Sequence, residues 1–242
     1  MLKEYDQITA LHYAAYRPYL HSEILKTNLK SNKKYDVGLD IGCGTGQSSI
    51  ALVHYCNKVL GIDSSSDMLD KSFDHPNVTY EIIHANELNF DADVFDIVTF
   101  AGSLYYAKSQ AILDEIVRVA KQKCKIIIYD FELFLEDVFV QLELYDDLKQ
   151  PTQYDHQTNF SGLNEQFLKL ENEIQSLVTL EIAITDLAHL LLSSKDNYVR
   201  LVTAFGTNNL YTKLSRQLRL VINSDMTTLK ARTYLTSYIV LK

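Results

Sequence analysis

Short apolar runs rich in β-branched residues alternate along this chain with helical patterns. The apolar runs cover residues 37–41, 59–63, 78–83, 95–100 and 125–130. Segments with apolar side chains three and four positions apart, as one face of a helix requires, lie between them at 47–56, 68–73 and 110–121. Repeated units of strand, crossover helix and strand form parallel sheets, so the alternation predicts an α/β protein with a doubly wound sheet.

Helical and strand patterns also flank this central region. A helical opening is predicted at residues 5–29, an amphipathic helix at 131–149, and further helices at 187–205 and 210–222. Residues 151–166 form a polar stretch of the length that often builds a lid over a site. Two further strands are predicted at 178–184 and 232–241.

Composition narrows the classes of protein that this chain can represent. With 242 residues, of which 47% are hydrophobic, the chain can bury one sizeable core, and the pattern is that of a soluble globular protein. A net charge of −8 opposes a large nucleic-acid footprint. We expect neither a membrane span nor a secretion signal, because no apolar run is long enough and acids stand early in the chain.

The cysteines indicate the compartment. Cys43, Cys56 and Cys124 are odd in number and lack CxxC spacing, which argues against a disulfide framework and against a zinc site. We therefore expect buried thiols, no bound metal and a cytoplasmic location.

A glycine-rich stretch follows the first predicted strand. Gly42, Gly44 and Gly46 allow the chain to turn sharply, so that backbone rather than side chains can approach a ligand. A helix then starts at Gln47, and its free N–H groups would face the same ligand, with Ser48 and Ser49 helping to satisfy them.

An acid ends the second predicted strand. Asp63 stands at the position where, in this architecture, a carboxylate accepts the two hydroxyl protons of a ribose, which implies an adenosine-type ligand. The dinucleotide fingerprint G-x-G-x-x-G fails here because its third glycine position is Gln47. A nicotinamide oxidoreductase is therefore disfavoured.

The pattern of an acid followed by G-x-G-x-G resembles the first motif of class I S-adenosylmethionine-dependent methyltransferases. Asp40 and the three glycines stand at its four fixed positions, and Asp63 matches the ribose-binding acid of that family. The segment HANELNF, residues 84–90, is similar to the adenine loop of the family, in which Asn86 or the backbone would hold the adenine amino group. The segment FDIVTFAGSLYY, residues 95–106, resembles the fourth strand and its following loop.

The N-terminal stretch YAAYRPYL, residues 13–20, resembles a small-molecule branch that includes trans-aconitate-type methyltransferases. That branch often has Leu-His-Trp after the fourth strand, where this chain has Leu104, Tyr105 and Tyr106. The resemblance implies a seven-stranded Rossmann-like sheet, whose last strand is antiparallel and inserted between the fifth and sixth, with a helical lid insertion after strand five.

The same resemblance implies a division of a single methyltransferase domain over residues 1–242. Its parts are an N-terminal helical cap at 1–35, a cofactor-binding core at 36–130, a helical lid insertion at 131–177 and a C-terminal part at 178–242.

The candidate site residues fall into two groups. Those expected to bind the cofactor are Tyr13, Arg17, Asp40, Gly42, Cys43, Gly44, Gly46, Asp63, Ser64, Met68, Ala85, Asn86 and Ala101. Those expected at the acceptor side are Tyr105, Tyr106 and His156.

Each side chain on the acceptor side, and two on the cofactor side, keeps a second interpretation. The two tyrosines after strand four can be aromatic walls without a catalytic proton, and His156 can be a base or a solvated loop residue. Arg17 can hold a carboxylate or form a structural ion pair, and Tyr13 can cover the cofactor or pack the first helix.

These observations predict a methyltransferase that uses S-adenosyl-L-methionine and acts on a small-molecule acceptor. Carboxylic acids are the acceptor class to test early, because an ionised carboxylate needs no base. The alternatives are a protein or RNA methyltransferase, and a binding protein that holds the cofactor without transfer. We expect no nucleic-acid or membrane partner, and the oligomeric state is open.

Overall fold

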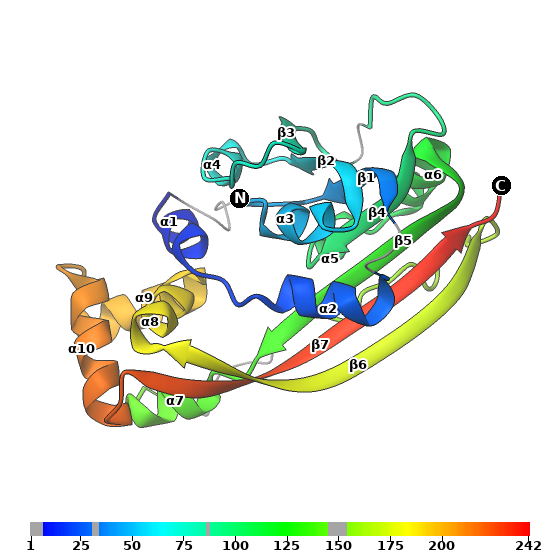
Figure 1. The fold of residues 1–242 in the computed structure, drawn as a ribbon. Coiled ribbons are helices and arrows are strands. Elements are labelled where there is room, and N and C mark those ends of the chain that lie inside the picture. Colours follow the sequence, from blue (N-terminus) through cyan, green and yellow to red (C-terminus); the bar gives the residue numbers. More distant parts are fainter. Residues whose placement is uncertain (1–6, 31–33, 86–87, 145–153) are drawn as a thin grey trace. The chain divides into compact units, whose positions relative to one another are not determined.

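A computed structural model gives the fold of the chain and describes residues 7–30, 34–85, 88–144 and 154–242 (Figure 1). The chain divides into two compact units. The sheet unit comprises Tyr19–Glu132, Tyr154–Ser176 and Thr233–Lys242, and the helical unit comprises Met1–Pro18, Leu133–Gln153 and Leu177–Arg232.

A seven-stranded sheet in the order β3-β2-β1-β4-β5-β7-β6 organises the fold, which confirms the predicted architecture. Its strands are β1 (Tyr35–Ile41), β2 (Cys56–Asp63), β3 (Val78–Ile82), β4 (Phe95–Ala101), β5 (Ala120–Leu133), β6 (Leu168–Ala183) and β7 (Met226–Val240). Three strands belong to both units. The last residue of β5 (Leu133), the second part of β6 (Leu177–Ala183) and the first part of β7 (Met226–Arg232) lie in the helical unit, and the rest of each strand lies in the sheet unit.

The strands β3, β2, β1, β4 and β5 are parallel to their neighbours, and their register places the carboxyl ends of β1 and β4 at one level of the sheet, past which β5 continues to Leu133. Ile41 at the end of β1 pairs with Phe100 in β4, and Ala101 at the end of β4 pairs with Tyr129 in β5. Residues that directly follow these positions therefore meet at one edge of the sheet, which is where ligands bind in open α/β sheets.

The last strand lies between β5 and β6 and runs opposite to β5 (Figure 1). Within the sheet unit, Tyr234 of β7 faces Glu132 of β5, and its hydroxyl donates to that carboxylate over 3.1 Å. The order and direction implied by the family resemblance are confirmed.

Helices of the sheet unit form where apolar positions recur on one face. In α6 (Gln110–Val119), Ile112, Leu113 and Ile116 are buried, and the N-cap hydroxyl of Ser109 accepts from the Ile112 N–H. The other helices of this unit are α2 (Leu20–Asn28), α3 (Gln47–Val53), α4 (Ser66–Leu69) and α5 (Leu104–Ala107).

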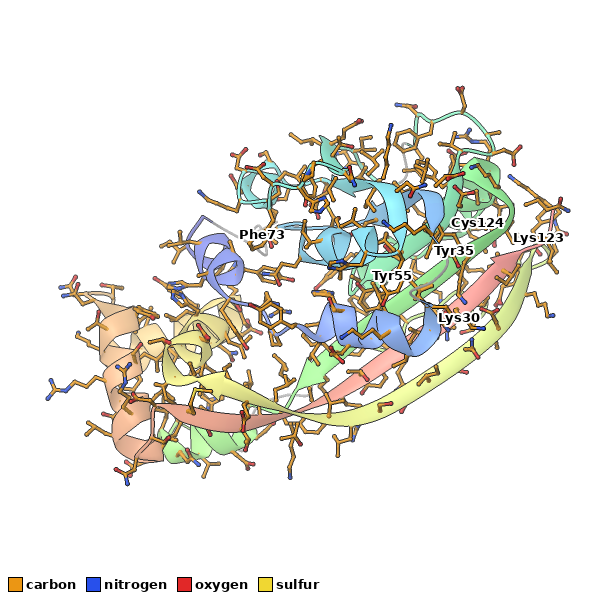
Figure 2. The ribbon with its side chains drawn as sticks, in the orientation of Figure 1. Lys30, Tyr35, Tyr55, Phe73, Lys123 and Cys124 are labelled. Atoms are coloured by element: carbon orange, nitrogen blue, oxygen red, sulfur yellow. The ribbon has the colours of Figure 1, made fainter. Side chains whose placement is uncertain are left out.

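The core of the sheet unit is one cluster of buried side chains, which includes Leu39, Ile62, Val98 and Ile126, all without exposed surface. Tyr35 and Cys124, at the amino-terminal parts of β1 and β5, are labelled in Figure 2 at the end of the sheet opposite the glycine stretch.

The thiols belong to this buried interior. Burial raises the pKa of Cys56 to about 12, and burial likewise raises the pKa values of the Cys43 and Cys124 thiols. All three cysteines are free and buried, which confirms the expectation of buried thiols.

The helical unit has its own core. Its helices are α1 (Gln7–Ala15), α7 (Glu136–Gln141), α8 (Ile184–Leu192), α9 (Lys195–Phe205) and α10 (Leu210–Ile222). Leu187, Leu191, Leu201 and Leu214 of this unit have no exposed surface. The prediction of a helix at 210–222 is confirmed.

Several predicted elements have different bounds. The opening helix is two helices, α1 and α2, because Pro18 lies between them and a proline disfavours helical backbone in the residue before it. The predicted helix 131–149 begins as the end of β5, continues as the short α7, and then reaches residues outside the described part. The predicted helix 187–205 is interrupted at Ser193, whose hydroxyl donates to the Leu190 carbonyl over 2.7 Å.

In the described part of the chain, none of the helices has the length and apolar character to cross a membrane.

Candidate functional site

The loop between β1 and α3 carries the three glycines in left-handed backbone conformations, with φ values of 71° at Gly42, 56° at Gly44 and 81° at Gly46. Two of them also lack room for a side chain. A Cβ atom at Gly42 would overlap Ser103, and one at Gly46 would overlap the Tyr80 ring and hydroxyl. The loop conformation therefore requires glycine at these positions.

Asp40, near the end of β1, holds the residues that flank this loop by hydrogen bonds. Its carboxylate has no exposed surface and accepts hydrogen bonds from the Ser48 and Ser49 hydroxyls over 2.6 and 2.7 Å and from the Thr99 hydroxyl over 2.7 Å. Burial raises the pKa of Asp40, and the three hydroxyl donors act in the opposite direction. The Ser48 and Ser49 hydroxyls therefore use their protons on this carboxylate, and their expected acceptance from N–H groups at the start of α3 stays a prediction.

Asp63 ties the glycine loop to the end of β2. Its Oδ2 accepts from the Gly44 N–H over 2.8 Å, and its Oδ1 accepts from the Ser65 N–H over 2.9 Å. A carboxylate offers about four acceptor sites, so Asp63 keeps acceptor capacity after these two backbone bonds. The side chain is half-buried, as a group that meets a ligand at the edge of a sheet must be.

Three other predicted cofactor residues lie beside this loop. Ser64 is exposed directly after Asp63, and the buried Met68 in α4 brings its terminal methyl to 3.0 Å from where a Cβ of Gly44 would lie. The Cys43 side chain is buried inside the sheet unit, so this residue could contact a ligand only through its backbone.

The predicted adenine loop follows β3. Ala85 packs against the core of the sheet unit and Leu88 is buried in it, while Asn86 lies outside the described residues. The Arg118 guanidinium of α6 donates to the carbonyls of Leu88 and Phe90, both over 2.7 Å, and so fixes the second half of this loop.

The end of β4 connects to the end of β1. Ala101 is the half-buried last residue of β4, and the next residue, Gly102, has a φ of 70° and donates its N–H to the Tyr129 carbonyl over 2.8 Å. The Ser103 hydroxyl donates to the Ile41 carbonyl at the end of β1. This segment therefore lies beside the glycine loop.

The three predicted acceptor-side residues lie around Tyr154 and Asp130. The ring centroids of Tyr105 and Tyr106 lie 4.6 and 5.7 Å from that of Tyr154, and the Tyr154 centroid lies 4.7 Å from that of the His156 ring. His156 Nδ1 lies 2.8 Å from Asp130 Oδ2. We call these five residues the tyrosine–histidine cluster.

Sequence reasoning missed Asp130 and Tyr154. The Tyr154 hydroxyl lies 2.9 Å from Asp130 Oδ2 and 2.7 Å from the Gly102 carbonyl oxygen, and it donates its one proton to either. The available signal was the acid after the apolar run of strand five, which repeats the arrangement that singled out Asp63 after strand two.

Tyr13 and Arg17 belong to the helical unit. The Arg17 guanidinium stacks on the Tyr13 ring, with its Cζ 4.3 Å from the ring centroid. Their proposed contact with the cofactor stays a prediction.

Comparison with known proteins agrees with this geometry. Residues 39–123, about a third of the chain, match a family model described as a methyltransferase domain. This segment runs from the last residues of β1 through the glycine loop, Asp63 and the segment after β4. This part of the chain is therefore similar to a methyltransferase domain.

Curated proteins named as methyltransferases also align with part of this chain. The chain is 35% identical over 98 residues to a demethylmenaquinone methyltransferase of Clavibacter sepedonicus, which covers 38% of this chain and 40% of that protein. It is 25% identical over 122 residues to a candidate methyltransferase of Dictyostelium discoideum, which covers 50% of this chain and 46% of that protein. The chain thus spans about half the length of the curated relatives it matches, or less.

A solved structure shares the whole fold. A candidate type II methyltransferase from Anaeromyxobacter dehalogenans superposes with a TM-score of 0.64 at 17% identity and covers 93% of this chain and 98% of that chain. The fold is therefore that of the class I methyltransferases.

The residues of this part of the chain fit S-adenosylmethionine, the cofactor that the resemblance of the glycine motif implies. Asp63 offers acceptor sites for ribose hydroxyls, and the glycine loop presents backbone without Cβ atoms. Thr45 in the same loop has a buried hydroxyl with no hydrogen-bond partner among the described residues. These are the groups that a polar ligand at this edge would satisfy.

Proposed function

We propose that this protein transfers the methyl group of S-adenosylmethionine to a small-molecule acceptor in the cytoplasm. The observation that carries the proposal is the link between the glycine loop and Asp63, made by the Gly44 N–H, inside a methyltransferase domain. The tyrosine–histidine cluster beside the end of β4 supports an acceptor site next to that loop.

We assign roles in cofactor binding and methyl transfer to these residues. Asp63 accepts the ribose hydroxyls, and the backbone of Gly42, Gly44 and Gly46 approaches the cofactor. S-adenosylmethionine supplies a methyl group on a sulfonium, which is a good leaving group. The protein then has to orient the acceptor and exclude water, which is worth roughly 7–11 kcal/mol in well-oriented reactions.

Tyr105 and Tyr106 are proposed as walls of the acceptor site. They are 36% and 58% exposed, so their rings are available at the surface of the sheet unit beside the segment that follows β4. For Tyr13 and Arg17, contact with the cofactor stays a prediction from the resemblance to the small-molecule branch.

The experiment is S-adenosylhomocysteine release from purified protein and S-adenosylmethionine. We expect release with a small-metabolite extract and none above background with a protein-and-RNA fraction. Release with the macromolecular fraction alone would replace the proposal by a protein or RNA methyltransferase. Saturable cofactor binding without release in either pool would indicate a binding protein.

A further inference from the structure

The tyrosine–histidine cluster combines three aromatic rings, a carboxylate and an imidazole. We propose that it receives an amine acceptor as the ammonium ion, and that His156, oriented by Asp130, removes the proton before methyl transfer. The inference rests on the proposed function and specifies its acceptor.

The Asp130–His156 pair has a defined hydrogen-bond direction. A carboxylate only accepts, so His156 Nδ1 carries the hydrogen in the 2.8 Å contact to Asp130 Oδ2. The other ring nitrogen, Nε2, then has a lone pair in the neutral imidazole. This is the arrangement in which a carboxylate orients a histidine as a general base.

Asp130 is itself held in place. Its Oδ1 accepts from the Phe131 N–H over 2.7 Å, and its Oδ2 lies 2.9 Å from the Tyr154 hydroxyl. The Asp130 side chain is 17% exposed and that of His156 is 27% exposed. The pair is therefore shielded, and the imidazole can still be reached by a small molecule.

The aromatic part of the cluster favours a cation. The Tyr105 and Tyr106 rings lie 5.3 Å apart at an interplanar angle of 89°, and both lie within 6 Å of the Tyr154 ring. Tyrosine faces attract cations, and Asp130 adds a negative charge beside them. A carboxylate acceptor would meet this charge unfavourably and would not use a base, so the cluster disfavours the carboxylic acids expected from the sequence.

The position of the cluster matches the proposed site. The Tyr154 hydroxyl lies 2.7 Å from the carbonyl oxygen of Gly102, in the segment whose Ser103 hydroxyl donates to Ile41 at the start of the glycine loop. Asp130 follows Tyr129 in β5, which pairs with Ala101 at the end of β4. The cluster and the glycine loop therefore share one edge of the sheet.

A base is chemically necessary for such an acceptor. An ammonium nitrogen has no lone pair, so its proton passes first to His156 Nε2, which forms an imidazolium paired with Asp130. The nitrogen lone pair then forms the bond to the methyl carbon, and the electron pair of the broken carbon–sulfur bond stays on sulfur as a thioether. The product is an N-methylammonium ion, and His156 returns its proton to water.

Other titratable groups face His156 and share its environment. The Tyr234 ring of β7 stacks on the imidazole, with centroids 5.9 Å apart and an interplanar angle of 9°, and its hydroxyl donates to Glu132. Tyr154 contacts it from the loop and Asp130 from β5. The pH dependence of activity in the His156→Ala variant is therefore measured against that of the wild type under matched conditions.

The acceptor class is tested by dividing a small-metabolite extract on cation- and anion-exchange resins. We expect S-adenosylhomocysteine release with the fraction that the cation exchanger retains. Release only with the anionic or neutral fraction would overturn the amine inference and leave the proposed function intact. Cofactor binding without release in any fraction would contradict both.

The role of His156 is tested with the active amine fraction and the His156→Ala variant. General base catalysis contributes roughly 10²- to 10⁴-fold, so we expect a loss of that size near neutral pH. The loss should shrink as the pH approaches about 10, where amines deprotonate without help. A loss that is equal at all pH values would overturn the base role.

Two further variants complete this test. Asp130→Asn should lower kcat without removing cofactor binding, because the amide no longer fixes the imidazole as the carboxylate does. The exposed His54 at the end of α3 provides the matched control, since His54→Ala removes a histidine far from the cluster in sequence. A similar loss in both histidine variants would contradict the assignment.

The cation-binding role is tested at Tyr106, the more exposed ring. Tyr106→Leu should raise KM by roughly 2- to 30-fold, which corresponds to the usual strength of a cation–π contact. Tyr106→Phe keeps the ring face and should keep most of the affinity. Equal KM values in the two variants would contradict recognition of a cation by the ring.

Discussion

Asp40 illustrates, at the scale of single residues, how the loop after β1 is held. Its buried carboxylate joins Ser48 and Ser49 of α3 to Thr99 of β4. These three hydroxyls would lose their acceptor if the carboxylate were removed. The residue that the family resemblance assigned to the cofactor motif therefore has a positioning role in the structure.

We predict that Asp40→Ala destabilises the protein by about 3 kcal/mol or more, because each unsatisfied buried donor costs about 1–3 kcal/mol. Urea denaturation measures this change. The control is Asp36→Ala at the exposed start of the same strand, where the carboxylate accepts only from the Asn57 side chain among its described contacts. Equal destabilisation by the two substitutions would contradict the role of Asp40.

Gly46 permits a comparison that separates backbone strain from steric overlap. Gly46→Ala introduces both a left-handed alanine and a Cβ that overlaps Tyr80, whereas Gly162 has a similar φ of 86° with no described atom within 4 Å of its Cβ position. We predict that Gly162→Ala costs about 1–2 kcal/mol and that Gly46→Ala costs clearly more. Chemical denaturation of both variants checks the order, and a reversed order would contradict it.

The packing of α1 against α8 in the helical unit is an interaction between elements that depends on pH. His12 Nδ1 lies 2.9 Å from His189 Nδ1, and the Tyr211 ring lies 4.3 Å from the His189 ring. Burial lowers the pKa of both histidines, the charge of His189 lowers that of His12 further, and Asp186 acts in the opposite direction on His189. Two neutral imidazoles share one hydrogen bond, and two protonated ones repel.

We predict that stability falls as the pH drops below 6.5. The unfolded state binds protons at higher pH than these two histidines do when folded, so their contribution is complete above 6.5 and is lost as the pH falls through the lowered pKa values. The free energy of unfolding, measured between pH 5 and 8, should fall less for His189→Gln than for the wild type. His54→Gln should keep the wild-type slope, and identical slopes for all three proteins would contradict the prediction.

Much of the parallel part of the sheet was predictable because its signals are local. The apolar runs ending at Ile41 and Asp63, followed by glycines or by an acid, indicate buried strands and their carboxyl ends without knowledge of the fold. The long strand β6 was not predictable to the same degree. It lies at the edge of the sheet and most of its residues are exposed, including Leu170 and Leu177, so the strand lacks the alternation that marks a buried face.

The tyrosine–histidine cluster shows why the sequence predicted only part of the candidate site. Tyr105, Tyr106 and His156 were candidates on residue type and loop position alone. Asp130 and His156 are separated by 26 positions in sequence and meet only through the tertiary fold. No local sequence pattern contains that contact, so the sequence did not identify Asp130 as the residue that orients the His156 ring.

At the scale of the whole molecule, two compact units have separate buried cores, one around the sheet and one among α7, α8, α9 and α10. The glycine loop, Asp63 and the tyrosine–histidine cluster all belong to the sheet unit. These residues therefore lie within one compact unit.

The central claim is that the glycine loop and Asp63 bind S-adenosylmethionine, and titration calorimetry tests it most directly. We predict saturable binding by the wild type, binding weakened by at least tenfold in Asp63→Ala, in line with the roughly 1.5–3 kcal/mol of a hydrogen bond to a charged group, and unchanged binding in the exposed control Asp70→Ala. Absence of binding in the wild type, or equal affinity in all three proteins, would contradict the claim.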